Sequence, residues 1–244
     1  MKPTLYGLHY SPWTHQARWA LRHHGIDYRY REHLPMLGEP LLRARRGVTG
    51  SGKVSVPMLV GSGIVITDSS EIARWADANG RGAPLFDRER EDEILEIEAI
   101  AERIRQAGRA LVVRALSQDP EARREELGMF PAPLRPMLDP LAKQAVDFVA
   151  RKYGALDRVP AQHESAMDAG LRALRDRLGG RTYFLDKFSW ADVTAATALT
   201  CVRPSTGKNV RLGPATRRCW TREALAEAYA DLLAWRDAIE ARHR

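Results

Sequence analysis

Short apolar runs alternate with amphipathic stretches in the first third of the chain. The apolar and aromatic residues at positions 5–10 predict a strand. Ser11 and Pro12 then supply an N-cap and a proline at the first helical position, and Gly25 ends the helix that they begin. Alternating tyrosines at residues 26–31 predict a second strand. Because a helix joins the two strands, we expect them to run parallel.

The same region continues with a second set of short elements. A short helix is expected near residues 40–46. Residues 56–60 and 64–67 flank a turn with two glycines, which predicts a hairpin. A helix capped by Asp68 or Ser69 follows, with its apolar residues on one face. The predicted order is therefore strand, helix, strand, helix, strand, strand, helix.

Beyond residue 86 the pattern is almost entirely helical. Isoleucines and alanines recur at helical spacing between residues 89 and 116, which predicts a long amphipathic helix. Four further helices are expected, at residues 134–153, 165–178, 189–202 and 222–243. The stretch before this region, residues 79–84, holds two glycines and a proline and is typical of a linker. We therefore predict an α/β domain over residues 1–80 and an all-helical domain over residues 87–244.

Composition and charge narrow the classes of function. Of the 244 residues, 44% are hydrophobic and 28% are charged, as in an ordinary globular protein. Most of the net charge of +7 comes from the first third of the chain, which fits either a solvated basic surface or steering of a small anion. No aromatic-basic stripe, zinc finger or recognition-helix pattern accompanies it, so we expect no nucleic-acid partner. No apolar run approaches the ~18 residues of a membrane helix, so we expect no membrane partner.

Cysteine and histidine usage indicates a reducing compartment and no metal site. Cys201 and Cys219 do not make a disulfide framework, and the N-terminal residues lack the apolar core of a signal peptide. We therefore expect a cytoplasmic protein in which Cys201 is a core thiol and Cys219 a loop thiol. The seven histidines show no metal-ligand spacing, so no metal is expected.

The start of the first predicted helix, from Ser11 to Thr14, has two interpretations. One is a plain N-cap. The other is an anion site, because a helix N-terminus offers unpaired N–H groups and the positive end of the helix dipole. A hydroxyl there can donate a hydrogen bond to a thiolate. Lowering a thiol pKa by ~2 units needs about 2.7 kcal/mol, which a charge-assisted hydrogen bond and the dipole supply together.

Two other segments also allow a structural and a binding interpretation. Pro57 either begins an edge strand or forms a cis bond that turns the backbone of Val56 towards a peptide-like ligand. Asp68 and Ser69 cap a helix, and the same groups are suited to a ligand's ammonium and carboxylate.

A glycine-rich stretch and a capping motif complete the candidate residues. The sequence from Gly47 to Lys53 nearly matches a phosphate-binding loop, but Val54 stands where a serine or threonine would hold magnesium. We therefore expect a flexible loop from which Lys53 reaches a ligand carboxylate. Ser189 and Asp192 form a capping-box-like pattern before an apolar helix, and we expect a purely structural role for them.

Together, four motifs resemble the cytosolic glutathione transferase superfamily. They are Tyr10-Ser11-Pro12-Trp13, Ser55-Val56-Pro57-Met58-Leu59, Thr67-Asp68-Ser69-Ser70-Glu71-Ile72 and Phe188-Ser189-Trp190-Ala191-Asp192. The resemblance covers essentially the whole chain and implies an α/β thioredoxin-like N-terminal domain followed by an all-α domain. It also implies a homodimer, with glutathione as co-substrate, no permanently bound cofactor, and an electrophile pocket made largely by the helical domain.

Position by position, the resemblance places Ser11 at the catalytic residue. It implies that the backbone of Val56 pairs with the cysteine of glutathione and that Asp68 and Ser69 bind the γ-glutamyl end. The full set of expected glutathione contacts is Trp13, Lys53, Val56, Pro57, Asp68 and Ser69.

The motif at Ser11 departs from its omega-like pattern because the cysteine of that branch is absent. Serine provides no thiolate for thiol–disulfide exchange. The resemblance therefore implies a Ser-type transferase that adds glutathione to a small hydrophobic electrophile. Tyr10 and Tyr6 are the alternatives to Ser11, since other branches use tyrosine. Two other functions stay open: a non-catalytic binding module, and a glutathione-dependent isomerase, dehalogenase or lyase.

Overall fold

The computed structural model describes residues 2–47, 54–61, 63–128, 130–205 and 212–244. Contacts divide the chain into two compact units. The first comprises Met1–Glu98, Arg181–Thr197 and Ala238–Arg244, and the second comprises Ala99–Gly180 and Ala198–Asp237. The division of the sequence into domains at residues 80–87 stays a prediction. No helix of the described residues is long and apolar enough to cross a membrane.

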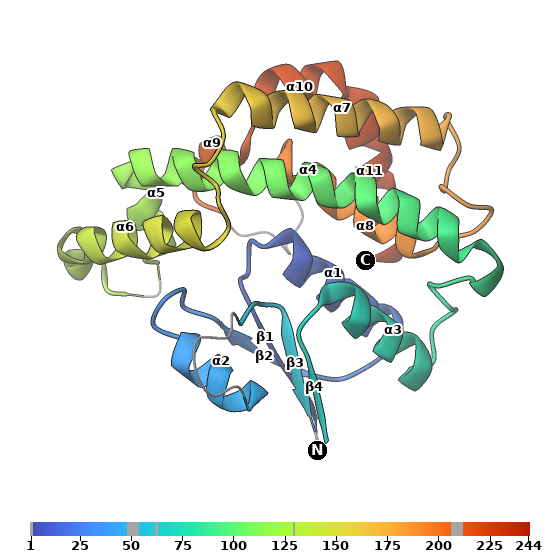
Figure 1. Cartoon of the computed structure of the whole chain (residues 1–244), viewed down its shortest axis with the longest axis horizontal. Helices are drawn as coiled ribbons and strands as arrows, with labels where there is room; N and C mark the ends of the chain where they lie inside the picture. The colour runs from blue at the N-terminus through green and yellow to red at the C-terminus, as the bar shows by residue number, and fades with distance from the viewer. Residues whose placement is uncertain (1, 48–53, 62, 129, 206–211) are drawn as a thin grey trace. The chain divides into compact units, whose positions relative to one another are not determined.

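The first unit contains a four-stranded sheet in the order β2-β1-β3-β4 (Figure 1). Its strands are β1 Thr4–Gly7, β2 Arg29–Glu32, β3 Met58–Gly61 and β4 Ile64–Ile66. The β1–β2 pair is parallel, whereas β3 runs antiparallel to both β1 and β4. The predicted parallel pair and the predicted hairpin are therefore both confirmed.

Three helices complete the α/β part of this unit: α1 Pro12–His23, α2 Glu39–Arg46 and α3 Ser69–Asn79. Helices α1 and α3 pack against each other. On one face of the sheet, Tyr6 and Met58 form a hydrophobic cluster with Leu42 of α2 and with Val54. Neighbouring residues of a strand point to opposite faces, so the buried Leu5 faces away from this cluster.

Strand β1 is shorter than predicted and ends at Gly7 instead of residue 10. The chain turns immediately afterwards, where the Ser11 N–H donates to the Leu8 carbonyl over 3.0 Å. A Cβ on Gly7 would lie 2.5 Å from Cγ2 of Thr14 in the first turn of α1. Glycine therefore permits the close approach between the end of the strand and the start of the helix.

The later residues are helical, as predicted, but in more pieces. The α-helices are α4 Glu91–Gln118, α5 Pro120–Glu126, α6 Arg135–Lys152, α7 Pro160–Leu178, α8 Trp190–Ala198, α9 Pro214–Trp220, α10 Glu223–Ala228 and α11 Ala230–His243. Single 3-10 turns lie at Arg88–Arg90, Ala132–Leu134 and Leu199–Cys201.

In this region two helices were missed and two predictions were wrong. Helices α5 and α9 were not predicted, although each begins with a proline at its first position. The single helix expected at residues 222–243 is two helices, because the backbone leaves helical geometry at Tyr229. Cys219 is a buried residue of α9 and not a loop thiol.

Cys201 is a core thiol, as predicted. Its side chain is buried in the second unit, where a Cβ on Gly108 of α4 would lie 2.5 Å from the Cys201 Cβ. Burial raises the pKa of the Cys201 thiol to about 12. This cysteine therefore stays protonated at neutral pH.

Candidate functional site

Ser11 occupies the N-cap position of α1, with extended backbone angles, and Pro12 begins the helix. Its carbonyl accepts a hydrogen bond from the His15 N–H over 3.0 Å. Its hydroxyl makes no capping hydrogen bond, although serine is a preferred capping residue. The side chain is only 7% exposed. The position is thus that of a cap, whereas the hydroxyl is not used as one.

The other residues considered at this helix start lie in different surroundings. Tyr6 belongs to the hydrophobic cluster beside α2. Tyr10 is half-buried, and its ring meets the His9 ring edge-on at 5.0 Å between centroids. Trp13 is half-buried in the first turn of α1. The catalytic assignment among Ser11, Tyr10 and Tyr6 stays a prediction.

The peptide bond between Val56 and Pro57 is cis, as the second interpretation of this segment predicts. It directly precedes β3, in which Met58 is registered with Tyr6 of β1. Strand β1 ends one residue later, and the chain then continues to the start of α1. The register therefore brings the cis bond to the end of the sheet from which α1 begins. Lys53, the remaining candidate from this segment, lies outside the described residues.

Asp68 caps α3, which confirms one of the two predicted caps. Its Oδ1 accepts hydrogen bonds from the N–H groups of Ser70 at 2.8 Å and Glu71 at 3.1 Å. Ser69 is buried, and its hydroxyl donates to Oε1 of Gln16 over 2.9 Å. Gln16 lies in α1, slightly more than one turn after Ser11. This bond therefore connects the first turn of α3 to the early part of α1.

Two residues that the sequence did not indicate extend this connection. The Gln16 amide donates to the hydroxyl of Thr194 in α8 over 2.8 Å. Glu98 of α4 accepts hydrogen bonds from the Ser70 hydroxyl at 3.3 Å and from the Trp190 ring N–H at 3.0 Å. Both are polar partners far away in the sequence, and neither belongs to a recognisable motif.

Ser189 and Asp192 hold the start of α8. One carboxylate oxygen of Asp192 accepts from the Phe184 N–H at 2.9 Å, and the other accepts from the Ser189 N–H at 2.8 Å and hydroxyl at 3.1 Å. Burial raises the pKa of Asp192 to about 6, against the opposing effect of these hydrogen bonds. All these contacts are internal to the fold.

A charged cluster lies beside the turn that precedes α1. Glu32 accepts hydrogen bonds from the His9 backbone N–H at 2.9 Å and from the Tyr30 hydroxyl at 2.8 Å, and the His9 ring lies 3.1 Å from the same carboxylate. Burial raises the pKa of Glu32, but these hydrogen bonds outweigh burial and leave the pKa below its ordinary value. Among the residues described, no group of three or more His, Cys, Asp or Glu side chains is arranged to hold a metal ion.

Sequence comparison agrees with this geometry for the first part of the chain. Residues 10–79 match the family model for the glutathione S-transferase N-terminal domain. The match spans the starts of α1 and α3 and the cis bond between them. No curated protein matches the sequence.

The fold resembles several solved structures at low sequence identity. A glutathione S-transferase from Methylobacillus flagellatus with bound glutathione is 17% identical, with a TM-score of 0.60 over 98% of this chain and 94% of that one. One from Methylobacterium radiotolerans, in complex with glutathione sulfonate, is 18% identical, with a TM-score of 0.61 over 99% and 92%. The beta-etherase LigF from Sphingobium sp. strain SYK-6 is 15% identical, with a TM-score of 0.61 over 99% and 96%. The chain therefore has the glutathione S-transferase fold, and its residues 10–79 match the glutathione S-transferase N-terminal domain.

Proposed function

We propose that this chain is a glutathione transferase that binds glutathione at the starts of α1 and α3 and stabilises its thiolate. One arrangement carries the proposal: an N-cap serine with an unused capping hydroxyl, a cis Val56–Pro57 bond and an aspartate-capped helix, all in the first unit. The match of residues 10–79 and the similar structures solved with glutathione or its sulfonate support it.

The start of α1 supplies the means to keep a sulfur anion charged. A charge-assisted hydrogen bond from Ser11 contributes ~1.5–3 kcal/mol, and the helix dipole adds ~0.3–1 kcal/mol. Their sum covers the ~2.7 kcal/mol that a two-unit fall in thiol pKa requires. The thiol proton leaves to solvent, and the thiolate then attacks an electrophilic carbon. A carbon–sulfur bond forms while the leaving group departs with its electron pair.

The start of α3 suits the γ-glutamyl end of glutathione. The Asp68 carboxylate attracts the ammonium group. The hydroxyl proton of Ser69 is already donated to Gln16, so we assign binding of the ligand carboxylate to the Ser69 backbone N–H. We assign pairing with the backbone of the glutathione cysteine to Val56, next to Pro57. We assign further contacts with glutathione to Trp13 and Lys53.

The remaining parts of the proposal concern partners and setting. We propose a small hydrophobic electrophile as second substrate, a role in detoxification, and a cytoplasmic homodimer. Leu134, Met137 and Leu141 are exposed at helical spacing along the start of α6, which supports a partner surface for a second copy. Sedimentation at increasing protein concentration tests this, and a monomer at all concentrations would contradict it.

The first experiment measures binding and conjugation separately. Tryptophan fluorescence during titration with glutathione reports binding through Trp13, and conjugation of an aryl halide reports turnover. We expect Ser11→Ala to lower kcat/KM by ~10²-fold, the usual effect of losing one donor to a developing or stabilised anion. Ser165→Ala, at an exposed position of α7, is the matched control and should leave activity unchanged.

The low exposure of Ser11 makes Tyr10 the necessary second variant. If Tyr10→Phe loses activity while Ser11→Ala keeps it, the donor is Tyr10 and the Ser-type assignment is wrong. If the wild-type protein binds no glutathione at millimolar concentration, the transferase proposal itself fails. Binding without turnover of any electrophile would instead indicate a non-catalytic module.

A second candidate function is glutathione-dependent ether cleavage, in which the thiolate displaces a phenolate. The similar fold of the Sphingobium beta-etherase favours it. An aryl ether substrate would then yield a free phenol and a glutathione thioether in equal amounts. Product analysis by mass spectrometry separates this reaction from aryl halide conjugation.

A further inference from the structure

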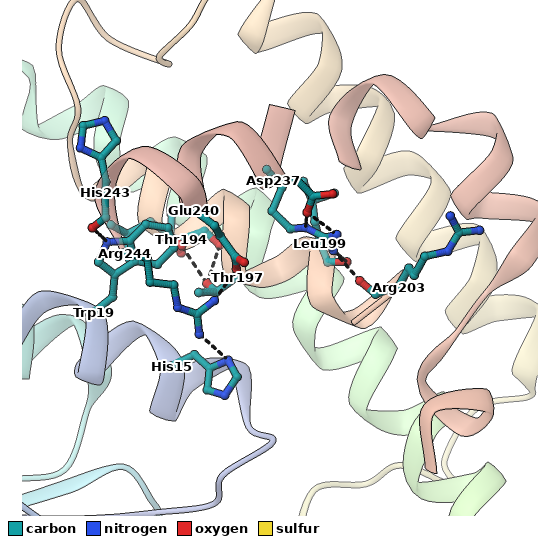
Figure 2. A network of polar contacts seen from close by, with 12 residues as sticks. His15, Trp19, Thr194, Thr197, Leu199, Arg203, Asp237, Glu240, His243 and Arg244 are labelled. Atoms are coloured by element: carbon teal, nitrogen blue, oxygen red, sulfur yellow. Dashed lines mark hydrogen bonds and ion pairs between the residues drawn. The ribbon is translucent and has the colours of Figure 1, made fainter. Parts of the chain in front are cut away.

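We propose that Arg244, acting through His15, is a positioning residue for the turn that carries Ser11. This inference rests on the proposed function, because it assigns Arg244 a role in holding the thiolate site. Arg244 follows α11 in the sequence, yet it lies beside α1 in the first unit, as Figure 2 shows. No motif of the sequence indicates this contact.

The ring of His15 is held by one partner on each nitrogen. Nε2 lies 2.7 Å from the His9 carbonyl oxygen, which can only accept a hydrogen bond, so Nε2 carries the proton. Nδ1 lies 3.1 Å from the Arg244 guanidinium, which can only donate, so Nδ1 carries the lone pair. The two contacts together select a single neutral tautomer of a buried histidine.

Arg244 is itself fixed by the surrounding fold. Its side chain is 6% exposed and forms an ion pair with Glu240, one turn earlier in α11. Its guanidinium also lies over the Trp19 ring of α1, 5.4 Å from the centroid. The backbone of the preceding residue also bonds to Trp19: the Trp19 Nε1–H donates to the His243 carbonyl over 2.9 Å (Figure 2).

The stacking of His243 adds a further anchor. Its ring lies parallel to that of Phe188, at 3.9 Å between centroids, and its Nε2 lies 2.9 Å from the Tyr183 hydroxyl. These contacts therefore hold the Arg244 guanidinium in place beside α1.

The hydrogen bond from His15 reaches the turn between β1 and α1. The His9 carbonyl accepts from His15, while the His9 N–H donates to Glu32 at the end of β2. The same turn is closed by the bond from the Ser11 N–H to the Leu8 carbonyl. The backbone of His9, two residues before Ser11, is thus held by Glu32 of β2 through its N–H and by His15, which contacts Arg244, through its carbonyl.

The electrostatics agree with this arrangement. Burial, the Arg244 guanidinium and the Arg18 guanidinium lower the pKa of His15 to about 3, with His9 as a weaker contributor, and only the hydrogen bond to the His9 carbonyl acts in the opposite direction. His15 is therefore neutral throughout the pH range in which a thiolate is useful. Its donor to His9 does not change with pH.

The first test is spectroscopic and needs no glutathione. Ring ¹⁵N shifts of His15, assigned by comparison with His15→Gln, should show the Nε2–H tautomer with no titration above pH 5 in the wild type. Arg244→Met should raise the titration midpoint of His15 by at least one pH unit and shift the amide signals of Tyr10 and Ser11. Arg103→Met removes an exposed arginine of α4 in the second unit and should change neither.

The second test measures the thiolate itself. Ultraviolet absorbance of bound glutathione against pH gives the thiol pKa in each variant. Arg244→Met should raise that pKa by about one unit and lower kcat/KM about tenfold below it, while the dissociation constant of glutathione changes less than threefold. A loss confined to glutathione affinity would overturn the positioning role.

Two variants of His15 distinguish the positioning role from simple misfolding. The amide of His15→Gln can donate to the His9 carbonyl and accept from Arg244, so it should retain a near wild-type thiol pKa. His15→Met has neither group and should behave like Arg244→Met. Equal effects of the two variants, or unchanged turn signals in Arg244→Met, would overturn the proposal.

The two proposals fail in different ways. If wild-type protein binds no glutathione, the proposed function and the thiolate part of this inference fall together. The ring shifts still decide whether Arg244 holds His15, since they are measured without ligand.

Discussion

The starts of α1 and α8 are both serine-led helix N-termini in the same unit, yet their polar groups are used differently. At α8, the Ser189 hydroxyl donates to the Asp192 carboxylate, which also accepts from the Phe184 and Ser189 backbone N–H groups. At α1, the Ser11 hydroxyl makes no capping bond, and the helix has no acidic residue in its first turn. A serine whose hydroxyl is bonded within the fold supports the helix start, whereas one whose hydroxyl makes no capping bond is suited to a ligand anion.

The largest expected effect on stability comes from removing the carboxylate at the start of α8. Asp192→Ala should lower the free energy of unfolding by about 2–4 kcal/mol, because the Phe184 and Ser189 N–H groups lose their buried acceptor. Urea denaturation measures this. Asp186→Ala, which removes an exposed carboxylate nearby, is the control and should cost under ~1 kcal/mol. Equal losses in the two variants would contradict the structural role of Asp192.

The pH dependence of stability should differ in sign between His15, near the start of α1, and Asp192, near the start of α8. The folded-state pKa of His15 is about 3, below the value near 6.5 of an unfolded histidine, so its contribution is complete above pH 6.5 and is lost as pH falls towards 3. The folded-state pKa of Asp192 is about 6, above that of an unfolded aspartate, so its contribution is present in acid and is lost as pH rises through 6.

His15→Gln should therefore remove about 3 kcal/mol of the destabilisation that occurs between pH 6.5 and pH 4. Urea titrations at several pH values measure the slope of the unfolding free energy against pH. Asp192→Asn removes the opposing contribution and should make the same slope steeper. A slope that His15→Gln leaves unchanged would show that His15 titrates normally in the folded protein.

Removing the Ser189 hydroxyl at the start of α8 should have a smaller effect. Ser189→Ala should destabilise the protein by about 1 kcal/mol, since one buried hydrogen bond to Asp192 is lost while the backbone bond stays. Thermal unfolding and urea denaturation both measure it. A neutral result would mean that the backbone bonds alone hold this helix start.

The smallest expected effect on stability is that of Ser11→Ala. Because the hydroxyl makes no capping bond, the free energy of unfolding should change by less than about 0.5 kcal/mol. The same variant is expected to lose most of the proposed transferase activity. Ser189→Ala should therefore lower stability, whereas Ser11→Ala should lower activity. A loss of 1 kcal/mol or more would identify Ser11 as an ordinary cap.

The sequence predicts those features that depend on neighbouring residues. The serine–proline helix start follows from local backbone chemistry, while the aspartate cap of α3 and the cis Val56–Pro57 bond were each one of two interpretations that the local sequence allows. The parallel pair follows from the helix that joins its strands. These features include most of the candidate glutathione site.

The features that escaped prediction depend on contacts between distant residues. Arg244 and His15 are 229 positions apart, and Gln16 and Thr194 are 178 apart, so no local pattern relates them. Likewise, the break at Tyr229 accompanies hydrogen bonds from its hydroxyl to Asp168, which no helical periodicity reveals. Tertiary context overrides local propensity at each of these positions.

The buried cysteines bear on how the protein would withstand the thiol ligand that we propose for it. Burial raises the pKa of both Cys201 and Cys219, to about 12 for the former, so almost no reactive anion exists on either side chain at neutral pH. A protein that handles a tripeptide thiol at millimolar concentration is exposed to its oxidised dimer as well. With both sulfur atoms shielded, such a protein can work in that mixture without becoming covalently tagged by it.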